Sequence, residues 1–277
     1  MKKIAYLGIP GSYSYIAAIK YFGKKNNMSA NNSITDVFLR VADKTCDFGV
    51  VPLENTTTGS ITETYDSLID SGSVIIGEIM LHIHHHLLGV GEKVGQSLNR
   101  ISTCYSHPQA IDQCQKFFKK HVGIKPVFTS DTATGARMIA QLNSDTNAAI
   151  GASHAAKLYG LQIWQKRIED NPNNFTRFAV IAKATKKKGN KISLVFSVEH
   201  RPGSLFRTLE PYARLGLNLT KIESRPVFGK PWEYIFFLDF EIGKRENQLS
   251  KLLSEMKEHV NFLKVLGRYN KGKIYET

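Results

Sequence analysis

The sequence predicts an α/β fold in two parts, a domain over residues 1–182 and a smaller one over residues 192–277. Short apolar runs alternate with amphipathic stretches through the first part, as in α/β domains with mainly parallel sheets. The second part has the element order βαββαβ, the ferredoxin-like arrangement. Residues 183–191 contain five lysines and no acidic residue, which predicts a solvated linker between the domains.

The elements of the first domain follow from hydrophobic periodicity. Apolar runs predict strands at 4–7, 48–51, 74–82, 101–104, 127–129, 148–150 and 175–181. Apolar residues at helical spacing predict helices at 14–22, 33–42, 61–69, 108–119 and 132–142. Ser33, with Asp36 three residues later, is a helix N-terminus signal.

The second domain changes from a strand pattern to a helix pattern and back, twice. Apolar residues at every second position from Ile192 to Val198 predict a half-buried strand, and a helix at 202–215 ends at Gly216. The remaining predicted elements are strands at 218–223 and 232–240, a helix at 247–258 and a strand at 262–269. A segment of about 80 residues can fold as a domain of its own.

The charge distribution argues against a nucleic-acid partner. The chain has 277 residues and a formal net charge of +13, which divides into +4 on residues 1–182, +4 on residues 192–277 and +5 on the linker. Neither domain is therefore strongly basic. The consecutive lysines at 186–188 have no neighbouring aromatic residue that could stack on bases, so the linker is better explained as a solvated segment.

Three further features place the chain in the cytoplasm. No apolar stretch approaches the roughly 20 residues that span a bilayer, so we expect no membrane partner. The apolar run after Met1 stops at Gly8, too soon for a secretory signal. Cys46, Cys104 and Cys114 are odd in number and form no C-x-x-C pair, so reduced thiols are expected rather than disulfides or a zinc site.

Four polar loops follow predicted strands and precede helices. They span residues 8–14, 52–60, 105–109 and 129–135 and are rich in hydroxyls, amides and glycine. Strand carboxyl ends are the usual ligand sites of such sheets, and backbone N–H groups at helix starts bind anions. Any one loop is explained by turns and helix caps alone, but four of one kind favour a site for a polar ligand. The chain has no nucleotide-binding glycine motif, so neither ATP nor NAD is expected.

Motifs along nearly the whole chain resemble those of the prephenate dehydratase family. The motifs are Ala5-Tyr6-Leu7-Gly8 with Gly11-Ser12-Tyr13-Ser14, then Pro52-Leu53-Glu54-Asn55-Thr56, then Ser106-His107-Pro108-Gln109 with Gln113-Cys114, then Thr176-Arg177-Phe178, and in the second domain Arg201-Pro202-Gly203-Ser204-Leu205 and Glu223-Ser224-Arg225-Pro226. Two departures are Ser204, where the family usually has Ala, and Asp131-Thr132, where it often has Ser-Thr. No segment before residue 1 could be a chorismate mutase, so the resemblance is to the monofunctional form.

The resemblance implies a fold and an activity. It implies a two-lobed catalytic domain like a periplasmic binding protein over residues 1–182, and an ACT regulatory domain over residues 192–277. The implied carbon–oxygen lyase reaction converts prephenate to phenylpyruvate in phenylalanine biosynthesis, with loss of carbon dioxide and water and without metal or cofactor. L-Phenylalanine would inhibit by binding between the ACT domains of a homodimer or homotetramer.

The resemblance also assigns residues. Thr176 is the catalytic residue; because its hydroxyl is a poor acid, we interpret it as a positioned hydrogen-bond donor to the leaving hydroxyl. Arg177 can grip a carboxylate, although strand alternation puts it opposite Thr176 unless the strand ends or bulges there. The other expected positions are Asn55, Ser106 and Gln113 for orienting substrate, Glu54, Thr56, Ser12 and Thr132 for shaping or lining the site, and Phe178 for packing on the face of Thr176. Phenylalanine is expected at Pro202, Gly203, Ser204, Leu205, Glu223, Ser224, Arg225 and Pro226.

The histidines of residues 82–86 raise a metal site as an alternative. In a strand, His82, His84 and His86 would share a face. No acidic or cysteine residue lies near them in the sequence and the resemblance implies no metal, so we expect a strand between the two halves of the domain instead.

Three other functions remain open at this point. An arogenate dehydratase uses the same chemistry on an aminated side chain. A non-catalytic amino-acid sensor would combine a two-lobed binding domain with an ACT domain, but the intact Thr176-Arg177-Phe178 argues against it. A nucleic-acid-binding protein is the third.

Overall fold

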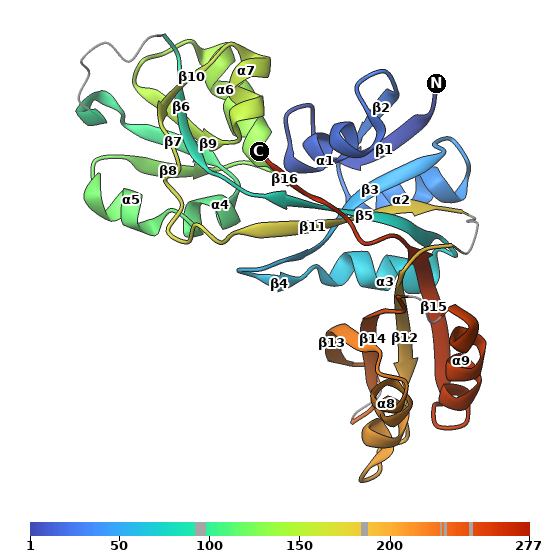
Figure 1. The fold of residues 1–277 in the computed structure, drawn as a ribbon. Helices are drawn as coiled ribbons and strands as arrows, with labels where there is room; N and C mark the ends of the chain where they lie inside the picture. The colour runs from blue at the N-terminus through green and yellow to red at the C-terminus, as the bar shows by residue number, and fades with distance from the viewer. Residues whose placement is uncertain (92–97, 184–187, 228, 230–231, 244–245) are drawn as a thin grey trace.

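The computed structural model describes residues 1–91, 98–183, 188–227, 229, 232–243 and 246–277. Part of the expected linker, residues 184–187, lies outside the described residues. The described strands form one sheet of eleven and one of five (Figure 1). The larger sheet has the order β13-β14-β12-β15-β5-β11-β3-β1-β2, with β16 beside β5 and β4 beside β3; the smaller has the order β10-β6-β9-β7-β8.

The first lobe is formed by the beginning of the chain and by one strand, β11, that follows the second lobe in the sequence. Its elements are β1 (Lys3–Leu7), α1 (Tyr13–Phe22), β2 (Asn27–Asn31), α2 (Ile34–Ala42), β3 (Phe48–Asn55), β4 (Gly59–Ser60), α3 (Thr62–Asp70), β5 (Val74–His82) and β11 (Phe175–Ala182). Strand β1 pairs in parallel with β2 and β3, whereas β11 lies antiparallel between β3 and β5. The returning strand therefore occupies the middle of the lobe, where Phe178, Ala179, Val180 and Ile181 are fully buried.

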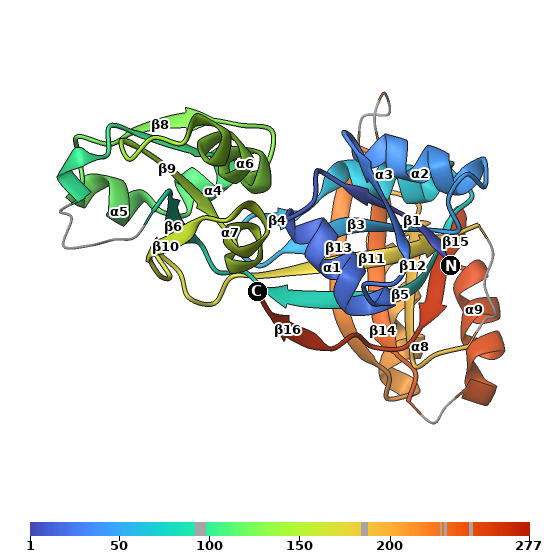
Figure 2. The same cartoon turned by 90° about the horizontal axis from the view of Figure 1, so that it is seen from above.

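The second lobe is the insertion between β5 and β11. Its elements are β6 (His86–Gly89), η1 (Leu98–Arg100), β7 (Thr103–Ser106), α4 (Pro108–Asp112), α5 (Gln115–Lys120), β8 (Lys125–Phe128), α6 (Thr132–Leu142), β9 (Asn147–Gly151), α7 (Ser153–Tyr159) and β10 (Gln162–Gln165). The chain enters this lobe after β5 and leaves it before β11, and Figure 2 shows the two crossings running side by side. The expected two-lobed α/β fold is confirmed.

The C-terminal part has the expected ferredoxin-like order. Its elements are β12 (Lys191–Ser197), α8 (Ser204–Arg214), β13 (Asn218–Pro226), β14 (Tyr234–Glu241), η2 (Glu246–Gln248), α9 (Leu249–Lys257) and β15 (Phe262–Tyr269). The antiparallel strand order β13-β14-β12-β15 is that of a βαββαβ unit. One face of this sheet packs on α8 and α9, and the other face contributes Val195, Phe237 and Leu266 to the hydrophobic core of the first lobe.

A close approach joins the C-terminal part to the first lobe. Gly267 in β15 pairs with Ile75 in β5, and a Cβ atom at position 267 would lie 2.2 Å from the carbonyl oxygen of Ile75. Only glycine allows this contact. The chain then continues as β16 (Ile274–Glu276), which runs parallel to β5 toward the second lobe (Figures 1 and 2).

Several sequence-based expectations needed correction. Both lobes have mixed rather than mainly parallel sheets, because β11 and β6 run antiparallel to their neighbours. The helix expected at 108–119 is divided into α4 and α5. The elements that were not predicted are β2, β4, β6, β10, β16, α7 and the 3-10 helices η1 and η2. They are short, and β2 has the polar sequence NMSAN, so hydrophobic periodicity gives no signal there. No helix among the described residues combines the length and apolarity needed to cross a bilayer.

Candidate active-site cleft between the lobes

A cavity of about 490 Å³ opens between the two lobes. All four polar loops line it, as the sequence predicts. The lining residues include Gly8, Ile9, Ser12, Tyr13, Ser14, Asn55, Ile61, Ile83, His85, His107, Gln109, Gln113, Ser130, Asp131, Thr132, Thr176 and Phe178. The structure thus brings together Ser12, Asn55, Gln113, Thr132, Thr176 and Phe178 of the expected site, which come from five separate segments of the chain.

The first turns of α1 and α6 give the cavity its electrostatic character. Ser12 caps α1 by accepting a hydrogen bond from the Tyr15 N–H, and Asp131 caps α6 by accepting one from the Thr134 N–H. Both helix N-termini, with their partial positive charge, face the cavity. The described lining residues include no lysine or arginine, so an anion in the cavity would be held by N–H groups and neutral side chains.

Thr176 is oriented by Asn55 on the neighbouring strand. Register places Thr176 of β11 beside Asn55 of β3, and the Asn55 amide donates to the Thr176 hydroxyl oxygen over 2.9 Å. Among the described residues, the Thr176 hydroxyl makes no other hydrogen bond, so its own proton is available to an acceptor in the cavity. Phe178 faces the same cavity two residues along, as the alternation of a strand requires.

Asn55 belongs to a hydrogen-bond network that crosses between the lobes. Its amide also donates to the Asn174 side-chain oxygen over 2.7 Å. The Asn174 amide donates over 2.9 Å to the Gln113 oxygen, which lies 2.8 Å from Nε2 of His85. Gln113, which the sequence alone would place in solvent, also donates from its amide to Thr57 over 2.7 Å. The network therefore fixes Asn55 from both lobes.

His85 and Tyr13 are neutral in this network. Burial is the main influence on both, and it lowers the pKa of His85 and raises that of Tyr13. Because Nε2 of His85 faces an amide oxygen, that nitrogen carries the proton, and Nδ1 lies 3.1 Å from the Tyr13 hydroxyl. The Tyr13 hydroxyl has one proton, which it shares between this nitrogen and the carbonyl oxygen of His84 at 2.8 Å. The two rings thus position Gln113 rather than titrate near neutral pH.

Arg177 lies on the opposite side of β11, away from the cavity. Its guanidinium pairs with Glu78 at 2.7 Å, Asp239 at 2.6 Å and Glu54 at 3.0 Å. Glu78 also pairs with Lys191 at 2.9 Å. Burial alone would raise the pKa of Glu78, but the two cations outweigh it and hold that pKa below its usual range. The expected binding of a substrate carboxylate by Arg177 does not fit this placement; Arg177 instead joins β11 to β14.

Three other expected residues also lie outside the cavity lining. Ser106 is fully buried and donates to the carbonyl oxygen of Ile150 over 2.8 Å, which joins β7 to β9. Thr56 donates to the carbonyl oxygen of Asn173 over 3.0 Å. Glu54 faces the C-terminal part, where it pairs with Lys221 of β13 at 2.6 Å. Glu54 faces away from the cavity because consecutive residues of a strand point to opposite sides, and Glu54 precedes Asn55 in β3.

The cleft also contains residues to which sequence reasoning gave no role. Tyr13 lines the cavity beside Ser12, and His85, His107, Gln109 and Asp131 reach it from loops or helix starts. Asn174 lies behind the lining, where it joins Asn55 to Gln113. Proximity to a motif was a usable signal for Tyr13 and Asn174. No local pattern marked His85, because its role depends on Gln113 and Asn174, which are distant in the sequence.

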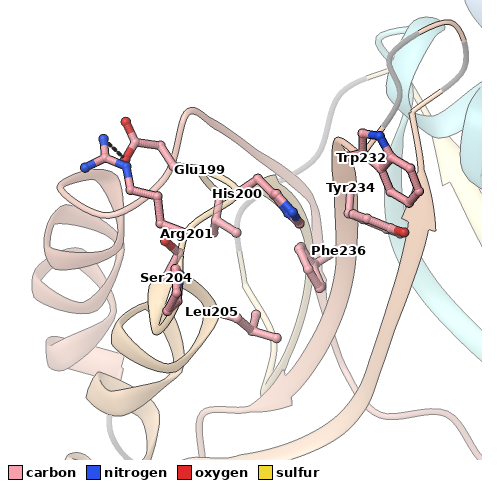
Figure 3. Close-up of a pocket in the computed structure, with 10 residues that line it drawn as sticks. Glu199, His200, Arg201, Ser204, Leu205, Trp232, Tyr234 and Phe236 are labelled. Atoms are coloured by element: carbon pink, nitrogen blue, oxygen red, sulfur yellow. Dashed lines mark ion pairs between the residues drawn. The ribbon is translucent and has the colours of Figure 1, made fainter.

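A second cavity, of about 370 Å³, lies in the C-terminal part (Figure 3). Ser204 and Leu205 at the start of α8 face Tyr234 and Phe236 of β14 across it, and Trp232 stands at its edge. Glu199 and Arg201 form an ion pair at its rim. The cavity thus combines aromatic and aliphatic surface with one charge of each sign. Pro202 lines it as well, so three of the four expected residues at 202–205 do so.

The other expected phenylalanine-binding segment, residues 223–226, lies away from this cavity. Glu223 accepts a hydrogen bond from Ser60 and pairs with Lys221 at 2.8 Å. Arg225 pairs with Asp66 of α3 at 3.1 Å. Ser224 and Pro226 are exposed on the opposite side of β13. Within one chain, the segment therefore contacts the first lobe, next to the end of β3, where Asn55 lies.

Comparison with known proteins identifies the family. A family model described as prephenate dehydratase matches residues 4–186. A curated prephenate dehydratase of Methanocaldococcus jannaschii is 38% identical over 277 residues, which cover 97% of this chain and 98% of that protein. A bifunctional chorismate mutase/prephenate dehydratase of Aquifex aeolicus is 39% identical over 276 residues, which cover 99% of this chain and 75% of that protein.

A solved structure agrees with the sequence relatives. The crystal structure of a prephenate dehydratase from Arthrobacter aurescens in complex with L-Phe superposes with a TM-score of 0.85 at 26% identity, covering 97% of this chain and 90% of that chain. The family model, the sequence relatives and the solved structure identify the same family. The chain belongs to the prephenate dehydratase family of lyases.

Proposed function

We propose that the cleft converts prephenate to phenylpyruvate, with Thr176 as the hydrogen-bond donor to the leaving hydroxyl. The observation that carries this is the bond from the Asn55 amide to the Thr176 oxygen, which leaves the Thr176 O–H free to donate to a ligand in the cavity. In the reaction the ring carbon–oxygen bond breaks and the oxygen leaves as water after gaining a proton. The ring carboxylate leaves as carbon dioxide, and its bonding electrons complete the aromatic ring.

The cavity lining suits the two carboxylates of prephenate differently. We assign the side-chain carboxylate, which keeps its charge, to the N–H groups at the start of α1, where the cap is the neutral Ser12. The ring carboxylate becomes neutral carbon dioxide and would be favoured near Ile61, Ile83 and Phe178, because an apolar surrounding penalises the charged form. Since Arg177 lies elsewhere, substrate binding depends on neutral donors.

Asp131 favours arogenate dehydration as a second candidate function. Its carboxylate is at the cavity, where the described lining residues offer no lysine or arginine to neutralise it. A carboxylate there would repel the prephenate dianion and attract the ammonium group by which arogenate differs. The ratio of kcat/KM on the two substrates separates the candidates: phenylpyruvate formed faster from prephenate supports the first, and turnover of arogenate alone would remove it.

Asp131→Ser is expected to shift that ratio toward prephenate by roughly 10–100-fold, the worth of one hydrogen bond to a charged group. Serine keeps the cap of α6, so the fold should persist. Asp145→Ser, an exposed change in the same lobe, serves as the control. An unchanged ratio would mean that Asp131 does not contact the part of the substrate that differs.

For regulation, we propose that residues 192–277 form an ACT domain that binds L-phenylalanine and that residues 1–182 form the catalytic domain. Of the linker expected at 183–191, Lys191 already belongs to β12 and is buried, so residues 183–190 would link the two. The solved relative with bound L-Phe and the cavity beside Leu205 support this role for residues 192–277. The apolar and aromatic side chains suit the phenyl ring, and the Glu199–Arg201 pair suits the ammonium and carboxylate groups (Figure 3). Because residues 223–226 lie apart from this cavity, a second chain in a homodimer or homotetramer would have to supply them.

A direct route connects this domain to Asn55. Lys221 of β13 pairs with Glu54, the residue next to Asn55 in β3, and Glu223 bonds to Ser60 of β4, which pairs with β3. A shift of β13 on ligand binding would therefore move the end of β3, where Asn55 orients Thr176. By linkage, a ligand that favours the less active state must bind that state more tightly.

L-Phenylalanine is expected to inhibit turnover, to raise the thermal unfolding midpoint, and to change the fluorescence of Trp232, one of two tryptophans in the chain. In Leu205→Ala, the phenylalanine concentration that produces each of the three effects should rise at least about tenfold, since burying a leucine side chain contributes about 1.5–3 kcal/mol. Leu253→Ala, in the same core but away from the cavity, is the control. Equal responses of the two variants would reject this location for the ligand.

We further propose a cytoplasmic location, which the free thiols of Cys46, Cys104 and Cys114 support. Light scattering at several protein concentrations would show whether the chain forms a dimer or a tetramer, and whether phenylalanine changes that state.

A further inference from the structure

The crossing from β5 to β6 carries two histidines that meet the C-terminal strand. His82 ends β5, His84 follows it, and β16 runs beside β5 so that Glu276 pairs with His82 in the strand register. Glu276 Oε1 lies 3.1 Å from Nδ1 of His82, and Glu276 Oε2 lies 3.0 Å from Nε2 of His84. Three potential ligand atoms, one from each residue, lie within 4.8 Å of one another.

The remaining ring nitrogens fix which nitrogen of each histidine carries its proton. Nε2 of His82 lies 2.6 Å from the carbonyl oxygen of Pro172, which can only accept. Nδ1 of His84 lies 2.8 Å from the carboxylate of Glu169, which also accepts from the His85 N–H. A neutral imidazole has one N–H group, and in both rings that group is therefore directed outward.

The lone pairs then converge on one point. Nδ1 of His82, Nε2 of His84 and the carboxylate of Glu276 are all electron-pair donors that face one another at about hydrogen-bonding distance. With both rings neutral, no proton lies between them, and the contacts would be repulsive without a cation. The arrangement requires either a second proton on each ring or one metal ion.

We propose that His82, His84 and Glu276 bind one divalent ion of the zinc class, with water as a fourth ligand. Two imidazoles and one carboxylate form a common zinc donor set. The outward bonds to the Pro172 carbonyl and the Glu169 carboxylate are the second-shell contacts that ligating histidines make. His84 is buried, whereas the Glu276 side chain is 67% exposed, so the ion has a path from solvent. Bound there, it would fasten β16 to the crossing between the lobes.

The sequence analysis raised a metal site at these histidines and argued against it, because the acidic residues of the cluster are distant along the chain. No acidic residue lies near the histidines along the chain, but folding brings in Glu169 and Glu276. His86, expected to share the face of His82 and His84, is not part of the cluster; its Nδ1 accepts from the Arg167 N–H over 3.1 Å. The sequence-based argument that the histidines lack an acidic partner was therefore wrong, because Glu169 and Glu276 contact them in the fold.

The test uses the purified full chain, treated with a chelator and then titrated with Co²⁺ and Zn²⁺. We expect one Co²⁺ per chain with the visible absorption of a four-coordinate site, displacement by Zn²⁺ in calorimetry, and a raised unfolding midpoint. Glu169→Gln should weaken binding about 10–100-fold as a second-shell change. Glu276→Gln and His82→Ala remove ligands and should weaken it further.

Matched controls are Glu258→Gln and His259→Ala, which alter an exposed carboxylate and an exposed imidazole away from the cluster. They should bind the metal as the unaltered chain does. Because the side chain of Glu276 is largely exposed, Glu276→Gln is expected to fold. Absence of stoichiometric binding, or equal affinity of Glu276→Gln and the unaltered chain, would overturn the proposal. None of these readouts involves turnover, so the result is independent of the proposed dehydratase function.

Discussion

Replacing Thr176 by alanine is expected to lower kcat on prephenate by about 10²–10³-fold, the typical cost of removing one preorganised hydrogen-bond donor. The hydroxyl stabilises charge that develops on the departing oxygen, so its contribution is larger in the transition state than in the bound substrate. KM should therefore change much less than kcat. Steady-state kinetics over a range of prephenate concentrations measure both.

Thr176→Ser is the matched variant, because it keeps the hydroxyl and removes one methyl group. It should retain most of the turnover. The unfolding free energy of the alanine variant should stay near that of the unaltered chain, since the side chain is part of the cavity wall rather than of a close-packed core. Near-normal kcat in Thr176→Ala would exclude the residue from the mechanism.

Replacing Arg177 by methionine is expected to reduce the free energy of unfolding by about 3–5 kcal/mol, as found when one member of a buried ion pair is removed. Glu78 and Asp239 would remain buried, with Lys191 as the nearest cation to both. The bond from the guanidinium to the Tyr269 hydroxyl, at 2.8 Å, would be lost as well. Urea denaturation followed by circular dichroism measures the change.

Arg214→Met is the control for this experiment. Arg214 pairs with Glu255 on the surface, and loss of an exposed pair costs about 0–1 kcal/mol. The kinetic readout distinguishes the two roles considered for Arg177. If Arg177 gripped the substrate, its loss would raise KM and leave the unfolding free energy nearly unchanged, which would restore the expectation drawn from the sequence.

Local patterns predicted much of the site correctly. Alternation along β11 puts Thr176 and Phe178 on one face and Arg177 on the other, and the structure agrees. The four polar loops were recognisable from composition and position after strands, and all four line the cavity. Both results depend only on the two-residue period of strands and the placement of loops in α/β sheets.

Contacts between distant segments could not be predicted in the same way. The partners of Arg177 come from β3, β5 and β14, and those of Gln113 from both lobes. No local signal showed that β11 would run antiparallel in the middle of the first lobe, or that β16 would return to β5. The buried position of Ser106 has the same origin, because it depends on the pairing of β7 with β9.

Asn55 is proposed to act by orienting the Thr176 hydroxyl, and a double-mutant cycle measures whether the two residues depend on each other. The kcat of Asn55→Ala, Thr176→Ala and the double variant would be compared with the unaltered chain, after unfolding curves confirm that each variant is folded. If the two residues act as one unit, the double variant should be about as slow as Thr176→Ala alone. If the two losses multiply, Asn55 and Thr176 act independently, and the orientation of Thr176 by Asn55 is not what drives the departure of the hydroxyl.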